Sequence, residues 1–384
     1  MDKKEIQRKW IKISVIILTL CLVLVYILTR LFAKLETEHI VHEALDPYFL
    51  KIGKLEIRWY AVCILSGALL VAFIAYYGIF RYVKFDADNL LTGLIWGLFS
   101  GVLGARIYYI IFEHDGLPSN FFDAFLEIIG LGPNGLSGLA IHGGIYATVI
   151  FLIIFCKVKK IKLLPLIEIV LPCFMLAQVV GRWGNFFNQE AFGTLVNGYV
   201  EGPLTEAQLL EQRLALKHLL VPDFVINNMY ITPNGSLDIP MITGYYYPTF
   251  YFESVLNFIG VITYMILRRK WKKIYLGDAV GFYLTWYGIV RFIIESLRTD
   301  PLMIGNIRVA LLTSVIFFVV GILVLVLRRV FKYRLEPVKE FFKNGTMWID
   351  ETYDPFIEIA EKKRLEKEKK LARKNKKDEN KNEQ

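Results

Sequence analysis

The chain has 384 residues, of which 55% are hydrophobic, 15% aromatic and 21% charged, and its mean hydropathy is +0.44. Soluble domains average about 45–50% apolar and roughly 25% charged residues. The apolar residues here gather in runs of about 17–25, long enough to cross the roughly 30 Å hydrocarbon core of a bilayer. The composition therefore excludes a soluble two-domain enzyme, a disordered chain and a collagen-like fibre, and it predicts a polytopic membrane protein.

Eight apolar stretches are each too long for a strand and show no alternating pattern, so they are predicted to be transmembrane helices. They are residues 13–31, 60–80, 90–112, 139–156, 163–180, 249–267, 279–297 and 309–327. The predicted fold class is an all-α polytopic membrane protein with about eight transmembrane helices. The four cysteines lie inside these runs without metal-type spacing, which favours a packing role.

The net charge of +9 is interpreted as a topology signal, and no nucleic-acid partner is expected. The N-terminus and the loops after the fourth and sixth stretches are basic, whereas loop 113–138 has no Lys or Arg and segment 181–248 has only three. By the positive-inside rule both termini are cytoplasmic, which requires an even number of spans and fits eight. Segment 181–248 is then an external segment large enough for a small head.

The predicted organisation has three parts. Residues 1–35 form a cytoplasmic start and an extra anchor; a cleaved signal peptide is the alternative, but no small-x-small cleavage site follows. Residues 57–327 form a seven-helix membrane domain that includes the head, and residues 328–384 form a basic cytoplasmic tail. The end of the tail, 361–384, could bind anionic lipid, but a solvated helix or a disordered tail without a task is the favoured explanation.

Ionisable residues inside a span are costly, and by default they mark a cavity or a functional site. Arg291 and Glu295 are four residues apart and so share one helix face, with Tyr287 a turn before them. An internal ion pair that fixes helix packing is the simpler explanation of this face. The ionisable residues in or beside the predicted spans are Arg106, His142, Glu168, Arg182, Glu190, Glu253, Arg291, Glu295 and, just beyond, Arg298.

The densest polar cluster is Gly181-Arg-Trp-Gly-Asn-Phe-Phe-Asn-Gln-Glu-Ala-Phe-Gly193, which directly follows a span. Arg182 offers a planar donor fork suited to phosphate, and Asn185 and Asn188 add neutral amide donors. The glycines allow close approach of the backbone to a ligand. A phospholipid headgroup would lie at this external interface, so the cluster is a candidate headgroup site.

His142 lies in Gly138-Leu-Ala-Ile-His-Gly-Gly144, near the outer start of the fourth span. A lone histidine on an apolar helix is more often a satisfied core residue than a catalyst. Here the adjacent glycines leave room beside the ring, and an unperturbed pKa near 6.5 suits proton abstraction. In the predicted topology His142, Arg182, Arg291 and Tyr60 reach the same side of the membrane. Their convergence predicts one site.

These motifs resemble the phosphatidylglycerol–prolipoprotein diacylglyceryl transferase family. The cluster 181–193 is similar to its long signature. Tyr247 replaces the usual histidine of a family segment that ends at Glu253, which leaves Glu253 a weaker candidate for a site residue. The family usually has about seven spans, one fewer than the eight predicted here. The supporting matches, in the family's order over about 57–327, are Arg58-Trp59-Tyr60, Gly104-Ala-Arg106, His142-Gly-Gly144 and Tyr287-Gly-Ile-Val-Arg291-Phe-Ile-Ile-Glu295.

The resemblance implies a bacterial cell-membrane enzyme whose active site faces outward. Such enzymes move the diacylglyceryl group of phosphatidylglycerol to the thiol of a preprolipoprotein lipobox cysteine and release glycerol phosphate; no metal or cofactor is required. The predicted catalytic residues are His142 as base or proton relay, Arg182 and Arg291 as phosphate clamps, and Tyr60. The predicted substrate-binding residues are Arg106, Arg182, Asn185, Asn188, Glu190, Gly193, Glu295 and Arg298.

The chemistry matches this set of residues, because a thiolate attacking an sp3 carbon leaves negative charge on the departing phosphate, where arginines stabilise it. A transporter or channel could use the same polar spans, but the repeats or paired broken helices of many transporters are missing. A membrane acyltransferase would need an acyl-donor site and a His-Asp type base, and it leaves the Arg182 cluster unexplained.

Overall fold

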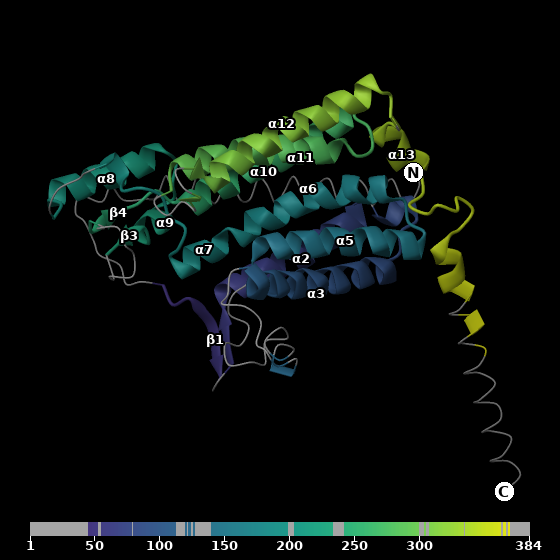
Figure 1. Ribbon diagram of the computed structural model, residues 1–384, viewed down its shortest axis with the longest axis horizontal. Coiled ribbons are helices and arrows are strands. Elements are labelled where there is room, and N and C mark those ends of the chain that lie inside the picture. Colours follow the sequence, from purple (N-terminus) through teal and green to yellow (C-terminus); the bar gives the residue numbers. More distant parts are fainter. Residues whose placement is uncertain are drawn as a thin grey trace, which may run out of the picture. The chain divides into compact units, whose positions relative to one another are not determined.

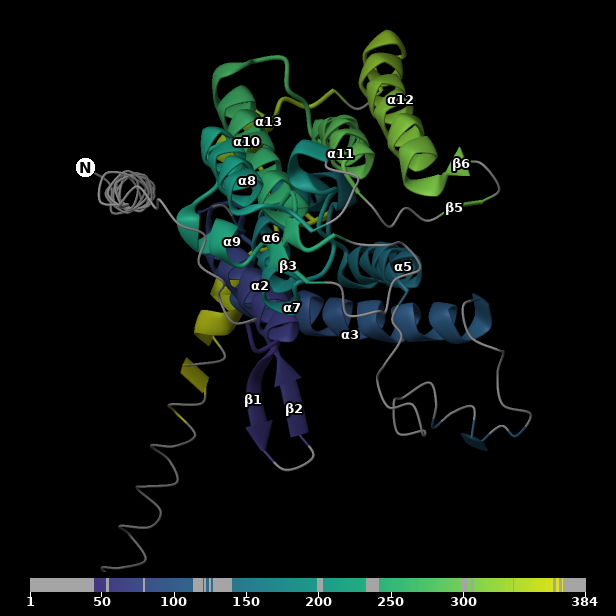
Figure 2. The ribbon, with the colours of Figure 1, turned by 90° about the vertical axis from the view of Figure 1, so that its left-hand side faces the viewer.

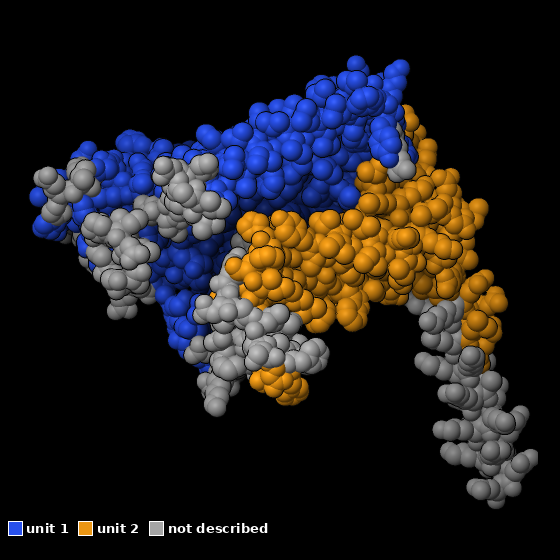
Figure 3. Space-filling model, viewed as in Figure 1, with its two compact units in different colours: residues 1–74, 167–339 blue, residues 75–166, 340–384 orange. Residues whose placement is uncertain are grey.

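The computed structural model divides the chain into two compact units (Figure 3). Unit 1 comprises residues 1–74 and 167–339, and unit 2 comprises residues 75–166 and 340–384. The residues that the structure describes are 45–52, 55–78, 80–112, 120, 122–123, 126, 140–198, 203–232, 242–298, 303–304, 307–333, 335–361, 364–365 and 368.

Helices dominate the described residues, as the long apolar runs predict. The helices are α2 (Trp59–Gly78), α3 (Ala87–Phe112), α5 (Ile141–Lys159), α6 (Leu163–Gly181), α7 (Trp183–Asn188), α8 (Glu206–His218), α9 (Asp223–Asn227), α10 (Thr249–Lys270), α11 (Asp278–Ser296), α12 (Val309–Val330) and α13 (Val338–Asn344), with the 3-10 helices η1 (Phe80–Val83) and η2 (Val196–Gly198). Short strands form three antiparallel pairs: β1 (Tyr48–Ile52) with β2 (Leu55–Arg58), β3 (Tyr230–Ile231) with β4 (Gly244–Tyr245), and β5 (Met303–Ile304) with β6 (Ile307–Arg308).

Six stretches of helix among the described residues are long and apolar enough to cross a membrane, in agreement with a polytopic membrane protein. The predicted span 13–31 lies outside the described residues. The predicted span 279–297 corresponds to α11, which has 19 residues, includes Asp278, Arg291 and Glu295, and is not among the six. The six are Trp59–Tyr77, Ala87–Phe112, His142–Lys159, Leu163–Asn188, Thr249–Lys270 and Val309–Val330.

In unit 1, α10, α11 and α12 run side by side (Figures 1 and 2). The helices α11 and α12 approach closely at glycines: a Cβ on Gly288 of α11 would lie 2.7 Å from the Ser314 carbonyl oxygen of α12. Small residues at such crossings let membrane helices pack backbone against backbone. On its other side α11 contacts α10 through Trp286, whose indole donates to the Leu256 carbonyl oxygen at 3.1 Å. The helix α11 is therefore in direct contact with both α10 and α12.

Between α7 and α10 the chain forms a small head, whose core also includes Phe186 of α7 and Phe250 of α10. Gln212 of α8 joins two other elements, because its amide donates to the Val196 carbonyl oxygen at 2.8 Å and accepts the Tyr245 N–H at 3.0 Å. Arg213 donates to the Tyr245 hydroxyl at 2.8 Å. Burial raises the pKa of Tyr245, while the Arg213 hydrogen bond acts in the opposite direction. The buried apolar core includes Val196, Leu209, Leu216, Val221, Val225, Ile226 and Met229.

The turn after α8 places a leucine in an unusual backbone conformation. Leu220 has φ 61°, in the left-handed region where glycine is the usual residue. The Val221 N–H bonds to the Leu216 carbonyl oxygen at 3.1 Å and the Leu220 N–H to the Lys217 carbonyl oxygen at 3.0 Å, which is the pattern of a Schellman cap. Left-handed backbone costs a non-glycine residue roughly 1–2 kcal/mol. An ion pair of 3.2 Å between Lys217 and Asp223 connects α8 to α9.

Unit 2 is built on the pair α3 and α5. The two helices meet at Gly104 and Gly143, where an added Cβ on either residue would collide with the opposite helix. The Ala140 N–H donates to the Ala105 carbonyl oxygen at 3.1 Å just before α5 begins. The start of α5 is therefore fixed against the middle of α3.

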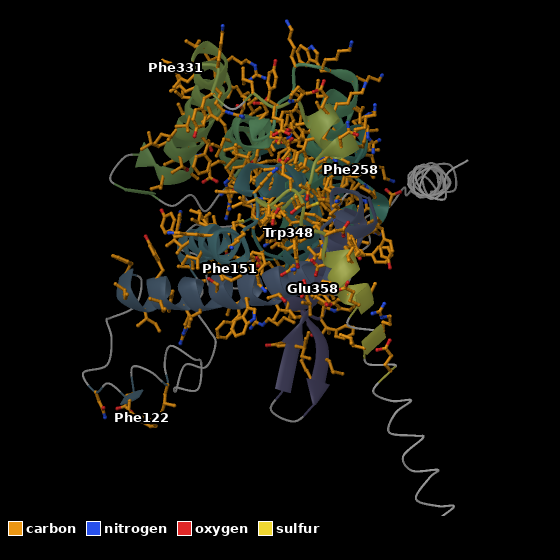
Figure 4. The ribbon with its side chains drawn as sticks, turned by 90° about the vertical axis from the view of Figure 1, so that its right-hand side faces the viewer. Phe122, Phe151, Phe258, Phe331, Trp348 and Glu358 are labelled. Carbon is orange, nitrogen blue, oxygen red and sulfur yellow. The ribbon has the colours of Figure 1, made fainter. Side chains whose placement is uncertain are left out.

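Part of the C-terminal segment is folded within unit 2, where the sequence predicts only a basic tail. The Trp348 indole donates to the Lys84 carbonyl oxygen at 2.6 Å, and its ring stacks on Phe85 with 6.0 Å between centroids. Lys162 and Glu351 form an ion pair of 2.8 Å. Trp348 and the later Glu358 are labelled in Figure 4. The structured part of this segment thus extends well past α12.

Candidate active site

The densest polar cluster of the sequence lies where α6 meets α7. The sequence predicts the end of a span at residue 180, but Arg182 has φ −62° and ψ −25°, so helical backbone continues into α7. The chain turns only at Gln189 and Ala191, which have φ 49° and 55°. Arg182 therefore projects from nearly continuous helix and not from a loop, which limits the positions that its guanidinium group can take.

Arg182 meets charged residues from two other helices of unit 1. Glu253 of α10 lies between two arginines: its Oε1 is 2.6 Å from Arg182 Nη2, and its Oε2 is 3.7 Å from Arg291 Nη1 of α11. Arg291 Nη2 lies 2.7 Å from Glu295 Oε2, one turn later on α11. Arg182, Glu253, Arg291 and Glu295 are called the arginine cluster below.

The two kinds of residue in the arginine cluster differ in exposure. The side chains of Glu253 and Glu295 are 2% exposed, whereas those of Arg182 and Arg291 are 25% and 17% exposed. Within the described part of the chain, Glu253 Oε1 and Glu295 Oε2 find no partner with hydrogen-bond geometry, although each lies within ion-pair distance of an arginine. Buried carboxylates thus hold the arginines mainly by charge. Because a guanidinium group has five N–H donors, both arginines retain donors for an anion.

The predicted amide donors already have a partner. Asn185 and Asn188 each donate an amide N–H to Glu190 Oε1 at 3.1 Å. Asn185 is buried and Glu190 is exposed. In this arrangement the two amides position the Glu190 carboxylate. To bind a ligand directly, they would have to give up their hydrogen bonds to Glu190.

Tyr60 of α2 lies against α7. Its ring contacts Gly184, where a Cβ would collide with it, and the neighbouring Trp59 stacks on Phe187 with 4.7 Å between centroids. The exposed Tyr60 side chain interacts electrostatically with Arg182 and Glu190. Tyr60 and the arginine cluster therefore belong to one region of unit 1.

Gly193 and Arg298 meet through their backbones, which form an isolated antiparallel bridge. Gly193 is buried, its N–H donates to the Tyr247 carbonyl oxygen at 2.8 Å, and a Cβ would lie 2.8 Å from the Leu297 carbonyl oxygen. The sequence predicts substrate binding for Gly193, but protein atoms occupy its surroundings. Its geometry indicates that it lets the end of α11 and the start of α10 pack closely beside the arginine cluster.

His142 and Arg106 lie in unit 2, whereas the other predicted site residues lie in unit 1. His142 is exposed at the second residue of α5, with its ring 6.2 Å from that of Tyr108. Arg106 is buried, and its guanidinium carbon lies 5.8 Å from the centre of the Tyr109 ring. Gly143, predicted to leave room beside the imidazole, packs against α3, so the space there is smaller than predicted.

Residues 47–327 match the family model described as prolipoprotein diacylglyceryl transferase. The chain belongs to the prolipoprotein diacylglyceryl transferase family. Three relatives, all named phosphatidylglycerol–prolipoprotein diacylglyceryl transferase, align over about three quarters of this chain. That of Streptococcus sanguinis (strain SK36) is 37% identical over 285 residues, 74% of this chain and 96% of the relative. Those of Staphylococcus xylosus and Streptococcus suis (strain 05ZYH33) are 36% and 39% identical, over 77% and 74% of this chain and 94% and 93% of the relatives.

The match confirms the resemblance seen in the motifs, and it covers the whole arginine cluster of this transferase. Residues 1–46 and the C-terminal segment from 328 lie outside it. In the described part of the chain, no group of three or more His, Cys, Asp or Glu side chains could hold a metal ion.

Glu253 is the member of the arginine cluster that sequence reasoning undervalues. The motif around Glu253 departs from the family pattern at Tyr247, so the motif alone gives this carboxylate little weight as a site residue. The available signal is its position five residues into a span, because a carboxylate inside an apolar helix needs a cationic partner. In the transferase that partner is a pair of arginines.

Proposed function

We propose that this transferase moves the diacylglyceryl group of phosphatidylglycerol onto the thiol of a lipobox cysteine in a preprolipoprotein, with release of glycerol phosphate. The family match and the names of the relatives support the reaction and both substrates. The observation that carries the proposal is the arginine cluster, in which partly exposed guanidinium groups lie over buried carboxylates. Such an arrangement suits a phosphodiester at a membrane surface.

The reaction is a substitution at carbon. The cysteine loses its thiol proton, because the thiolate is the nucleophile. The sulfur then forms a bond to an sp3 carbon of the glycerol backbone while the bond from that carbon to a phosphate oxygen breaks. The electron pair of the broken bond stays on the phosphate oxygen, so the leaving glycerol phosphate gains negative charge. Preorganised donors directed at that charge lower the barrier.

The residues of the transferase divide this work. Arg182 and Arg291 bind the phosphate, and Glu253 and Glu295 keep the two guanidinium groups oriented. Tyr60 orients the substrate, and His142 accepts or relays the thiol proton.

The proposed topology has eight spans, cytoplasmic termini and an active site on the external face of the bacterial cell membrane. In its support, α10 ends in Arg268, Arg269 and Lys270, whereas Glu253 lies at the opposite end of the same helix. A reporter fused after Pro203, in the head, is expected to be extracytoplasmic, and one fused after Asn344 is expected to be cytoplasmic. Two reporters on the same side would contradict the eight-span topology.

The reaction is tested with the full chain in vesicles, using phosphatidylglycerol with labelled acyl chains and a lipobox peptide. The expected product is a peptide whose mass has increased by one diacylglyceryl group. The matched controls are a peptide with serine in place of the cysteine and vesicles of phosphatidylcholine alone, neither of which should give product. A mass increase of a single acyl group would favour an acyltransferase, and no product at all would overturn the proposal.

A further inference from the structure

The head carries an exposed apolar edge that the proposed chemistry does not use. Leu219, Leu220 and Phe224 lie in and just after the turn between α8 and α9, and they are 49%, 63% and 52% exposed. These three residues are called the head edge below. Large apolar side chains exposed together outside a span mark a surface that contacts a partner or a membrane.

Two contacts place the head edge beside the ends of spans. The Tyr251 hydroxyl, on the third residue of α10, donates to the Leu220 carbonyl oxygen at 2.8 Å. The Phe224 ring stacks on Trp183 of α7 with 6.0 Å between centroids. Both Tyr251 and Trp183 belong to candidate spans. Tyr and Trp are enriched where a span crosses the membrane–water interface, so these contacts hold the head edge at that depth.

The backbone of the turn keeps Leu220 directed away from the head core. Leu216 and Val221 are fully buried behind the turn, and the Schellman hydrogen bonds fix its shape. Glycine would satisfy the left-handed conformation of residue 220 without strain. A large apolar side chain is unfavourable here on two counts, because the backbone conformation prefers glycine and the side chain is exposed to solvent. Residues that are locally unfavourable in this way concentrate at functional surfaces.

We propose that the head edge enters the lipid leaflet at the end of the spans where the arginine cluster lies, and so anchors the head at the depth of the phospholipid headgroups. The occupant of this surface is membrane lipid, because the edge is continuous through Tyr251 and Trp183 with helices that are long and apolar enough to span a membrane. In Figure 2, α9 lies at the left-hand edge of the described part of unit 1. A peripheral edge can reach lipid without entering the site.

The test measures depth in the membrane independently of catalysis. A nitroxide is attached to Leu220→Cys or Phe224→Cys in the full chain, with the four native cysteines replaced by alanine, in phosphatidylglycerol-containing vesicles. The control is Ala207→Cys, an exposed position on α8 eleven residues before the helix ends at His218, about 16 Å along the helix axis. Relaxation by oxygen, which concentrates in lipid, is compared with relaxation by a water-soluble nickel complex.

Labels at 220 and 224 are expected to respond at least fivefold more to oxygen, relative to nickel, than the label at 207. Equal ratios at the three positions would overturn the proposal. Protection from both reagents would show that protein covers the head edge, and protection that appears only with the lipobox peptide would assign the surface to the peptide substrate; both results contradict lipid insertion. Because the readout needs no turnover, it stands or fails separately from the transferase assay.

Discussion

The helices α6, α10 and α11 bury carboxylates at both ends, but the two ends satisfy them differently. At the end where the basic residues of α10 lie, Glu168 accepts the Tyr264 hydroxyl and the N–H groups of Gly277 and Ala279, at 2.8 and 3.1 Å for the N–H groups. These are directed hydrogen bonds to a fully buried side chain. At the other end, Glu253 forms ion pairs with two partly exposed arginines, and among the described residues its Oε1 has no partner with hydrogen-bond geometry.

The first residue of α11 extends this contrast. Asp278 is buried and holds Arg328 at 2.9 Å and Arg329 at 2.8 Å, while it also accepts the Tyr275 N–H at 2.9 Å. The end of these helices where the basic residues of α10 lie is called the basic end below. Its buried carboxylates are therefore part of a network of hydrogen bonds and ion pairs that joins helices. The arginine cluster has the same residue types but keeps guanidinium groups exposed, which is the condition for binding an anion. Burial of charge is common to the two ends, whereas the completeness of the hydrogen bonds differs between them.

The largest effect is expected from Arg182. Arg182→Gln should lower diacylglyceryl transfer per folded enzyme by a factor of about 10²–10³, which is typical of losing one preorganised donor to developing charge. The transfer rate of Arg182→Lys should lie between that of Arg182→Gln and that of the unaltered enzyme, because lysine keeps the charge but lacks the planar donor fork of arginine. Transfer to the lipobox peptide is measured after folding is checked by size exclusion in detergent.

Arg328→Gln is the matched control, because it removes an arginine from a buried ion pair at the basic end. It should lower the yield of folded protein while leaving turnover per folded molecule within about twofold, since a site without catalytic contacts supplies no transition-state stabilisation. Near-normal turnover of Arg182→Gln, or equal losses in both variants, would remove the distinction between the two ends.

The second prediction concerns the network at the basic end. Glu168→Leu leaves the Gly277 and Ala279 N–H groups without their acceptor, and each lost bond to a charged group is worth roughly 1.5–3 kcal/mol. The free energy of unfolding should therefore fall by about 3–6 kcal/mol, measured by thermal unfolding in detergent, with turnover per folded enzyme nearly unchanged. A stable but inactive variant would show that the basic end takes part in catalysis.

Local sequence patterns predict the features that depend on neighbouring residues. The apolar runs predict the helices to within a few residues, and α11 is offset by one residue from the predicted range. The i,i+4 spacing of Arg291 and Glu295 correctly places them on one face, where they pair. The pairing of Arg182 with Glu253 is different, because it depends on which helices are neighbours, and spacing within one helix carries no information about that.

The same limit explains where the prediction of the site is incomplete. The motif around Arg182 suggests free amide donors, but Asn185 and Asn188 donate to a carboxylate close by in the sequence. The glycine beside His142 suggests open space, but α3 fills it. A motif identifies residue types and approximate depth in the membrane, whereas the surroundings of each side chain depend on packing between distant segments.

The third prediction separates packing from ligand binding at Gly193. A Cβ at this position meets the Leu297 carbonyl oxygen at 2.8 Å, and backbone atoms cannot move as freely as the end of a side chain. Overpacking of this kind costs about 1–3 kcal/mol. Gly193→Ala should therefore lower the unfolding temperature, with the KM for phosphatidylglycerol changed little in the molecules that remain folded. A raised KM without loss of stability would instead restore the substrate-binding role.

The smallest effect is expected at the end of the chain, beyond the contacts that fold the C-terminal segment into unit 2. The segment is attached through Trp348 and through the ion pair of Lys162 with Glu351, and both precede residue 361. Removal of residues 362–384 should therefore leave the unfolding temperature and the turnover unchanged, and at most alter a salt-dependent affinity for anionic vesicles. Trp348→Ala is the contrasting variant, because it removes a buried ring and its hydrogen bond to the Lys84 carbonyl oxygen, and it should lower the unfolding temperature. If the truncated enzyme is well folded but inactive, the basic residues of the tail act in the reaction, and the separation of a structural basic end from a catalytic opposite end no longer holds.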